Sequence, residues 1–335
     1  MTHRDQFVCS VSQNIPLCRE HFRLVLKLPD FPATEPGQFI QLSCRDLDHD
    51  YNPQHDMAWE PGDRLSLEGD ELRGPLAMLR RPFSLAGRRD TADGVELDII
   101  HRVVGVGTDW LSHLKVGDRA FILGPLGNRF TLPPKEGLAI LVGGGVGIPP
   151  MLYLAEKLKG MQAVAFCGAL SRELLPLTIR PEAPLPTSDA FAPVPTIEEF
   201  ARHGVESAIS TDDGSYGFRG FVTQALERYL DQLGFVAGEA RHGDKETPST
   251  QHSPIVYTCG PEPMMKRVAD IAASRGLQCQ IAVERAMACG MGTCQSCCIK
   301  VRKPDPAKPP LPGREWCYRL ACTDGPVFRG SDLLW

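Results

Sequence analysis

The sequence lacks any apolar run near the ~20 residues that a membrane-spanning helix needs, because glycine, proline or charged residues break each candidate. Its first ten residues, MTHRDQFVCS, lack the apolar centre of a secretory leader. It also lacks a basic excess, since 36 Lys and Arg stand against 41 Asp and Glu, for a net charge of −5. Nucleic acid and acidic membrane surfaces are therefore not expected as ligands. We expect a cytoplasmic protein with no membrane span.

Cysteine, by contrast, is plentiful: the chain has 12, and several crowd into CGMGTCQSCC, which begins at Cys289. In a reducing compartment, clustered cysteines are more often metal ligands or redox groups than disulfides. The spacing Cys289-x4-Cys294-x2-Cys297, followed by a distant cysteine, is typical of a plant-type [2Fe–2S] cluster. Gly290 and Gly292 allow positive φ angles in this loop and bring backbone N–H groups toward the sulfurs.

Two alternatives compete with the iron–sulfur interpretation. A structural zinc site also uses Cys-x2-Cys and four thiolates, and the cysteines could simply be buried without a metal. We favour iron–sulfur because x4 followed by x2 within one loop is unusual for zinc ribbons. Cys298 is left out, since it adjoins Cys297 and neighbours in an extended segment point to opposite sides. The spacing leaves Cys317 and Cys322 both open as the fourth ligand.

Three regions of different character follow one another along the chain. Residues 1–132 contain short strand-like segments at 22–28, 37–44, 81–87, 95–104 and 119–125, separated by Gly and Pro turns, which predicts a small antiparallel β-barrel or sandwich. Residues 133–282 alternate apolar strands with helical patterns, with strand–turn–helix patterns at 137–160 and 253–276, which predicts a parallel, Rossmann-like α/β sheet. Residues 283–335 are cysteine-rich and predict a small third domain. Three proline-rich or polar segments are expected on the surface: 176–200, 236–254 and 302–313.

A glycine-rich turn stands at the start of the second region, where ILVGGGVGIPP includes Gly143, Gly144, Gly145 and Gly147. Backbone amides in such a turn can approach a phosphate, but the strict GxGxxG pattern is absent and tight packing is an equal alternative. In the first region, LRRPFSLAG places an arginine and a serine around Pro-Phe. These residues suit a pyrophosphate and a flat ring, although a solvated arginine and a core phenylalanine are favoured without further context.

Several motifs occur together in one order: RPFS, RVVGVGT, GPLGNRF, GGGVGIPP, DDGSYGFRGFVT, TCGPEPMM, the cysteine signature and ACTDGPVF. This combination resembles the ferredoxin-reductase superfamily, and most closely the electron-transfer subunits of type B dihydroorotate dehydrogenases. The resemblance spans nearly the whole chain apart from the three surface segments. It implies an oxidoreductase subunit with an FAD-binding β-barrel, an NAD-binding α/β domain and a [2Fe–2S] domain.

The resemblance also implies roles for individual residues. It implies FAD contacts at Arg81, Pro82, Phe83, Ser84, His101, Arg102, Val103, Gly107 and Thr108. It implies contacts with the nicotinamide nucleotide at Gly143, Gly144, Gly145, Gly147, Cys259, Gly260 and Pro261. The family's fourth cluster cysteine precedes DGPVF, which implies Cys322 as the ligand in place of Cys317.

The resemblance further implies a partner. Dihydroorotate would be oxidised in an FMN-containing catalytic subunit, and its electrons would pass through the cluster and FAD to NAD⁺ in pyrimidine biosynthesis. A heterotetramer with two copies of each subunit is expected, with no acid–base catalyst in this chain. One alternative is an NAD(P)H-dependent reductase subunit of the sulfide dehydrogenase, hydrogenase or ferredoxin:NADP reductase type. Another is a zinc-stabilised regulatory or nucleotide-binding module.

For some residues the sequence leaves two interpretations open. Asp212 and Asp213 either orient a ribose or cap the turn before Gly214. Met287 and Met291 flank the first cluster cysteine and either meet the partner or shield the cluster. Ser171–Arg172 follows a strand and leaves NAD and NADP both open as the nucleotide.

Overall fold

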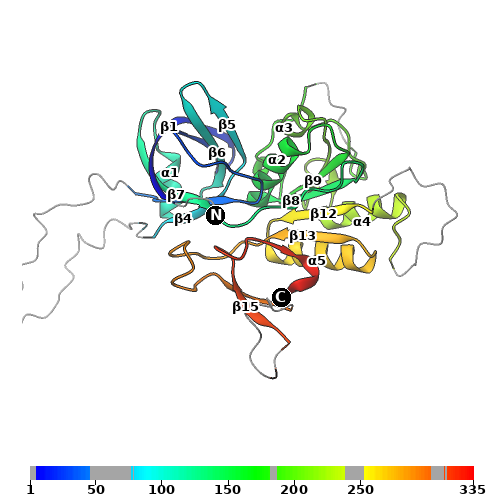
Figure 1. The fold of residues 1–335 in the computed structure, drawn as a ribbon. Helices are drawn as coiled ribbons and strands as arrows, with labels where there is room; N and C mark the ends of the chain where they lie inside the picture. Colours follow the sequence, from blue (N-terminus) through cyan, green and yellow to red (C-terminus); the bar gives the residue numbers. More distant parts are fainter. Residues whose placement is uncertain are drawn as a thin grey trace, which may run out of the picture.

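The computed structural model describes residues 5–45, 77, 79–181, 187–237, 253–302, 313 and 315–335. It contains two seven-stranded sheets and one three-stranded sheet. In Figure 1 the first sheet and the second sheet lie side by side, and the C-terminal residues, in orange and red, lie below both. Of the helices in the described ranges, none is both long and apolar enough to cross a membrane.

The first sheet is antiparallel, with the order β4-β3-β7-β1-β2-β6-β5. Its end strand β4 also lies against β6, so the sheet curls into a half-barrel. Its elements are β1 (Asp5–Cys18), β2 (His21–Leu28), β3 (Phe39–Leu42), β4 (Arg81–Ser84), β5 (Gly87–Thr91), β6 (Gly94–Arg102), α1 (Val106–Ser112) and β7 (Arg119–Leu126). The strands expected at 22–28, 37–44, 81–87, 95–104 and 119–125 are present, whereas β1 and the short helix α1 were not predicted.

Alternation of apolar and polar residues explains how these strands form. In β6, Val95, Leu97 and Ile99 are buried, while the intervening Glu96 and Asp98 are only partly covered. Successive side chains on a strand point to opposite faces, so this pattern buries one face of the sheet against its own interior. The interior is closed by leucines, isoleucines and Phe31.

The second sheet has the order β11-β10-β9-β8-β12-β13-β16, and all pairs are parallel except β13 with β16. Its strands are β8 (Ala139–Gly144), β9 (Ala163–Ala169), β10 (Glu206–Thr211), β11 (Phe218–Arg219), β12 (Ile255–Cys259), β13 (Gln278–Ala282) and β16 (Val327–Arg329). The direction of strand succession reverses between β8 and β12. The carboxyl ends of these two strands therefore meet at a topological switch point, where open α/β sheets bind ligands.

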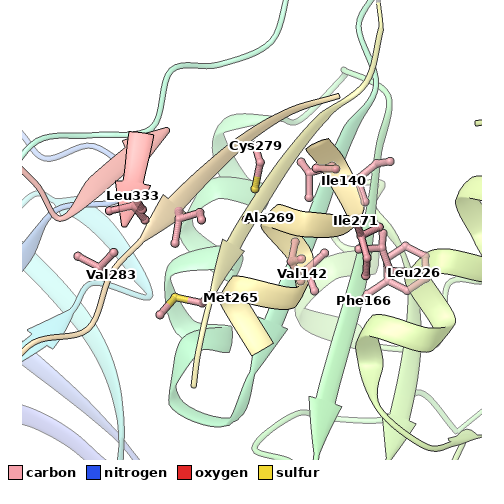
Figure 2. Close-up of a cluster of buried hydrophobic side chains, with 14 of the residues drawn as sticks. Ile140, Val142, Phe166, Leu226, Met265, Ala269, Ile271, Cys279, Val283 and Leu333 are labelled. Carbon is pink, nitrogen blue, oxygen red and sulfur yellow. The ribbon is translucent and has the colours of Figure 1, made fainter. Parts of the chain in front are cut away.

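Helices cover both faces of the second sheet. One face carries α2 (Ile148–Lys157) and the short α3 (Glu198–Ala201), and the other carries α4 (Val222–Gln232) and α5 (Glu262–Ser274). Figure 2 shows the second face, where Val142 and Phe166 of the sheet pack with Leu226 of α4 and with Met265 and Ile271 of α5. The strand–turn–helix patterns expected at 137–160 and 253–276 are both confirmed.

The tract 176–200 is only in part the surface segment that its prolines indicated. Ile197 and Phe200 are fully buried in the core beneath α2, and Ile179 forms a β-bridge with Ile197. Apolar residues at the two ends of the tract pack against the sheet, whereas residues 187–195 are exposed or half-buried and lie at the surface. Most of the segments 236–254 and 302–313 lies outside the described residues.

The C-terminal residues form a small sheet of order β15-β14-β17. Its strands are β14 (Cys298–Val301), β15 (Cys317–Leu320) and β17 (Leu333–Leu334). Between them, β16 adds an antiparallel edge to the second sheet, so the cysteine-rich region is physically continuous with the α/β unit. The boundaries proposed at residues 132 and 282 stay predictions.

Candidate functional site

A cavity of about 1360 Å³ lies where the two larger units meet. Strand β4, the end of β6 and the loop that follows it line one side. The turns after β8 and β12, at the topological switch point, line the other side, and residues 284–287 complete the wall. The cavity thus joins the three regions that the sequence predicted separately.

Strand β4 supplies the wall on the side of the first sheet. Its four residues, Arg81 to Ser84, all line the cavity. The Arg81 guanidinium donates to the Leu79 carbonyl oxygen at 3.0 Å, and within the described residues no carboxylate pairs with it. Its positive charge is therefore open to an anionic ligand.

His101 is the most polar buried group on this wall. Its ring stacks on Phe22 at 5.8 Å and meets the edge of Phe83 at 6.1 Å, and only 2% of the residue is exposed. Neither ring nitrogen has a hydrogen-bond partner in the described part of the chain. Burial, with a further contribution from His21, lowers the pKa of His101 to about 4. A neutral imidazole without a partner beside a cavity fits a ligand with polar ring atoms, as FAD has.

The loop after β6 is held by Thr108, whose hydroxyl oxygen accepts from the backbone N–H groups of Val104 and Gly105 at 2.9 and 3.2 Å. Arg102 lines the cavity while its Nε donates to the Glu20 carboxylate at 2.9 Å. Val103 does not line the cavity, and its backbone N–H donates to the Glu20 carbonyl oxygen.

The turns after β8 and β12 pack against each other closely. A methyl group on Gly147 would overlap the Cys259 carbonyl oxygen, and one on Gly144 would lie 2.5 Å from the Met264 sulfur. Of the glycines predicted to contact a nucleotide, Gly144 and Gly145 line the cavity. Three others support the turns from behind without lining it: Gly143, Gly147 and Gly260.

Cys259 and Pro261 line the cavity beside these turns. Burial raises the pKa of the Cys259 thiol to about 12, so it stays protonated and is not a nucleophile. The two acidic neighbours divide the roles left open by the sequence. Asp212 lines the cavity, whereas the Asp213 carboxylate accepts from the Ser215 N–H at 2.9 Å and caps the turn.

The cysteine loop adopts the conformation that its glycines predict. Gly290 and Gly292 have φ angles of 69° and 88°. The backbone N–H groups of Met291 and Cys294 each donate to the Cys289 sulfur at 3.4 Å. The loop therefore surrounds the first thiol with donors, as an anionic sulfur ligand requires.

The four predicted cluster cysteines form two pairs. Cys294 lies against Cys289, and the Ser296 hydroxyl lowers the pKa of Cys294 to about 6. Cys322 interacts with Cys297, and both are almost fully buried, which raises the pKa of Cys322 to about 12. In the described ranges no three His, Cys, Asp or Glu side chains converge as a single-ion site. Cys322 also interacts with Cys289, so the two pairs belong to one group of four thiols, the number that a [2Fe–2S] cluster takes.

The remaining cysteines of this region point elsewhere. Cys298 begins β14 and is exposed. Cys317 pairs with Val301 in β15, at the end of the β14–β15 ladder farther from Cys298. The structure thus brings Cys322 to Cys297 and leaves Cys317 on the small sheet. All twelve cysteines lie in the described residues, and none forms a disulfide.

Asn128 of the GPLGNRF motif anchors the segment that follows Cys322. Its amide donates to the carbonyl oxygens of Asp324 and Val327 at 3.0 and 2.8 Å, and its oxygen accepts from the Val327 N–H at 2.8 Å. The sequence singled out this motif without assigning a role to it. The structure shows that Asn128 joins the first sheet to β16.

Comparison with known proteins places these features in a family. Residues 284–334 match the model described as the iron-sulfur cluster binding domain of dihydroorotate dehydrogenase B. The electron transfer subunit of dihydroorotate dehydrogenase B (NAD(+)) from Geobacillus thermodenitrificans is 35% identical over 279 residues, which cover 82% of this chain and 87% of the relative. The chain belongs to this family. The electron transfer subunit from Fusobacterium nucleatum is 28% identical and covers 97% of both chains.

Solved structures agree on the fold of this dihydroorotate dehydrogenase B electron transfer subunit family member. An NADH-dependent reduced ferredoxin-NADP oxidoreductase superposes with a TM-score of 0.62 at 23% identity, over 98% of this chain and 90% of the other. A cytochrome P450 reductase from Amycolatopsis gives 0.54 at 22% identity, over 82% and 67%. The predicted all-β plus α/β architecture with a C-terminal iron–sulfur domain is confirmed.

Some cavity residues of this family member were not assigned a contact from the sequence. His21 and Phe39 line the cavity without belonging to a recognised motif, and Phe221–Thr223 line it as the end of the DDGSYGFRGFVT motif, for which the sequence implied no ligand contact. The two methionines near the first cysteine have different environments. Met287 is 8% exposed and lines the cavity, whereas Met291 is 53% exposed and open to a partner.

Proposed function

We propose that this chain is the electron-transfer subunit of an NAD-dependent dihydroorotate dehydrogenase and links a catalytic partner to NAD⁺ through a [2Fe–2S] cluster and FAD. The observation that supports this most is the contact between the cavity and the cysteine loop. Met287 lines the cavity and also packs in one apolar cluster with Cys297 and Cys322. The relatives of this chain are named as electron transfer subunits of dihydroorotate dehydrogenase B (NAD(+)). These names support dihydroorotate as the substrate of the complex and NAD as the nicotinamide nucleotide.

For FAD we propose the wall formed by β4 and the end of β6. The free charge of Arg81 suits the pyrophosphate, and Ser84 and the unpartnered ring of His101 suit the polar edge of the flavin. Four further residues are proposed contacts: Pro82, Phe83, Gly107 and Thr108. Arg102 keeps its ion pair with Glu20, so it contributes to the shape of the proposed FAD site more than to its charge.

For NAD we propose the facing wall at the switch point. Gly144 and Gly145 expose their backbone to the cavity, and Cys259 and Pro261 lie beside them. When bound, FAD accepts or gives electron pairs with the nicotinamide and single electrons with the cluster, which is why it belongs between them. The side chains of this chain bind and orient these groups, and no acid–base residue is required here.

A catalytic partner follows from the family name, and we propose that it is an FMN-containing subunit in a heterotetramer with two copies of each chain. In the described residues, both seven-stranded sheets already contribute walls to the cavity that we propose binds the two nucleotides. The described ranges contain no (β/α)₈ barrel for dihydroorotate. Exposed Met291, beside the cluster cysteines, is the proposed contact with the partner. A reducing, cytoplasmic compartment is proposed because four free thiolates must reach iron.

The test is anaerobic purification with the native partner, followed by cofactor analysis and an assay with dihydroorotate. We expect FAD, about two irons per chain and dihydroorotate-dependent formation of NADH. Cys322→Ser is expected to abolish the cluster absorbance and this activity, while flavin reduction by NADH persists. Cys317→Ser is the matched control and keeps both.

Zinc without flavin would contradict the proposal and support a regulatory module instead. Loss of the cluster in Cys317→Ser, with retention in Cys322→Ser, would overturn the ligand set. If the co-purified dehydrogenase does not oxidise dihydroorotate, the proposed substrate is wrong, while the proposed cofactors stand.

A further inference from the structure

Gln41 is a buried amide in an unusual place. It lies on β3, where its backbone pairs with Pro82 of β4, and none of its surface is exposed. Phe39, two residues earlier on the same strand, lines the cavity. A carboxamide can make up to four hydrogen bonds, and burying it without them is costly. Burying a leucine at position 41 would cost less free energy than burying a carboxamide, so the polar group here needs an explanation.

The Gln41 amide contacts the cysteine loop on both sides of Cys289. Its Nε2 donates to the Ala288 carbonyl oxygen at 3.4 Å. A methyl group on Gly290 would lie 2.6 Å from its Oε1, so only a glycine lets the loop come this close. Two segments about 250 residues apart in sequence are therefore held together at the residue next to the first thiol.

The Gln41 Oε1 is also incompletely satisfied. It has no donor within the described residues, although it is buried beside Gly290. Loops that hold iron–sulfur clusters carry many backbone N–H groups, and outer partners of this kind orient the ligands. The unused acceptor thus faces the segment that presents such donors.

Apolar contacts also hold the cysteine loop against the first sheet. A methyl group on Gly290 would also meet the Leu126 side chain, and Leu126 packs with Phe39, Met287 and Cys297 in one cluster. The same strand therefore carries Phe39 toward the proposed flavin site and Gln41 toward the proposed cluster. Any shift of the loop on β3 changes the separation of the two cofactors.

We propose that Gln41 is a positioning residue, which clamps the Cys289 loop onto the first sheet and sets the cluster at its working distance and orientation from FAD. The inference rests on the proposed function and adds a residue to it. Gln41 touches neither a reacting atom nor a thiol directly, and acts through Ala288 and Gly290. No bond is made or broken by it.

The test compares Gln41→Leu with Gln38→Leu in the purified complete chain, mixed with NADH in a stopped-flow instrument. Both glutamines are buried, but the Gln38 amide contacts Glu35 and Gly127 and not the cysteine loop. In Gln41→Leu we expect flavin reduction at the wild-type rate and cluster reduction slowed by about tenfold or more. We also expect a changed electron paramagnetic resonance spectrum of the reduced cluster. Gln38→Leu is expected to lower thermal stability without either change.

A wild-type spectrum and wild-type cluster reduction in Gln41→Leu would overturn the inference, even if its stability fell. If Gln41→Leu does not fold, Gln41→Glu serves, because it keeps the volume and the acceptor and removes the donor to Ala288; the same two readouts decide. Wild-type protein without flavin or iron would instead refute the proposed function, so the two failures are distinguishable.

Discussion

At the scale of single residues, the buried imidazole of His101 gives the molecule a pH dependence. Its pKa is lowered from 6.5 to about 4 by burial. As pH falls below about 6.5, the unfolded chain binds a proton that the folded chain refuses. As far as His101 is concerned, the free energy of unfolding therefore keeps its full value above about pH 6.5 and decreases progressively as the pH falls toward 4. At about 1.4 kcal/mol per pKa unit, the loss amounts to roughly 3 kcal/mol at most.

We predict that His101→Phe, which keeps a ring against Phe22, removes this contribution. Between pH 7 and pH 4.5 the melting temperature of the wild type should fall further than that of the variant, by several degrees. Thermal unfolding at both pH values measures the difference. His113→Asn is the control, since the His113 side chain is 75% exposed and should leave the wild-type slope unchanged. Equal slopes in wild type and His101→Phe would contradict the prediction.

At the scale of elements, the turns after β8 and β12 work as one unit. Gly147 must lack a side chain because the Cys259 carbonyl oxygen occupies its place, while Gly145 faces open space with a φ of 52°. The two glycines therefore serve different purposes. Gly147 lets the ends of β8 and β12 approach each other, and Gly145 permits a backbone conformation that residues with an L side chain rarely adopt.

We predict that Gly147→Ala costs about 3 kcal/mol or more, because backbone on both turns must shift. Gly145→Ala should cost about 1 kcal/mol, from its positive φ alone. Thermal unfolding measures both, and the Michaelis constant for NADH should rise more in Gly147→Ala. A larger loss in Gly145→Ala would show that turn conformation, and not the contact between turns, limits this site.

At the scale of the whole molecule, the first sheet holds the cysteine region at two points. Gln41 meets the loop at Ala288 and Gly290, and Asn128 bonds the segment after Cys322. The loop that carries Cys289, Cys294 and Cys297 and the segment that follows Cys322 thus have separate anchors on one sheet. This arrangement explains how a region with few strands of its own is kept in place.

We predict that Asn128→Ala frees this segment, because it leaves two carbonyl oxygens and the Val327 N–H without partners. Such a loss costs about 1–3 kcal/mol, so hydrogen exchange within residues 320–330 should accelerate by about tenfold or more. Asn14→Ala is the matched control: the Asn14 amide also donates to three carbonyl oxygens, at and just after α1. It should leave exchange at 320–330 unchanged. Unchanged exchange in Asn128→Ala would contradict the anchoring role.

Local patterns accounted for much of the fold and of the site. Alternation predicted the strands of the first sheet, and glycine-rich strand-to-helix turns predicted the unit around α2. The same reasoning missed the buried ends of the tract 176–200, since prolines suggest a surface segment and cannot report that Phe200 is buried. The sequence also could not report that Gly143 and Gly147 do not line the cavity, and their contact with the nucleotide stays a prediction.

The sequence by itself determined the chemistry of this protein, because the spacing of Cys289, Cys294 and Cys297 and the order of its motifs are properties of neighbouring residues. The motif order implied Cys322 as the fourth ligand, and the tertiary structure places it beside Cys297. Only the tertiary structure decided that Gln41 lies against the loop of the first thiol. The physical reason is that such contacts depend on how sheets and loops pack across the whole chain. No local spacing records that packing.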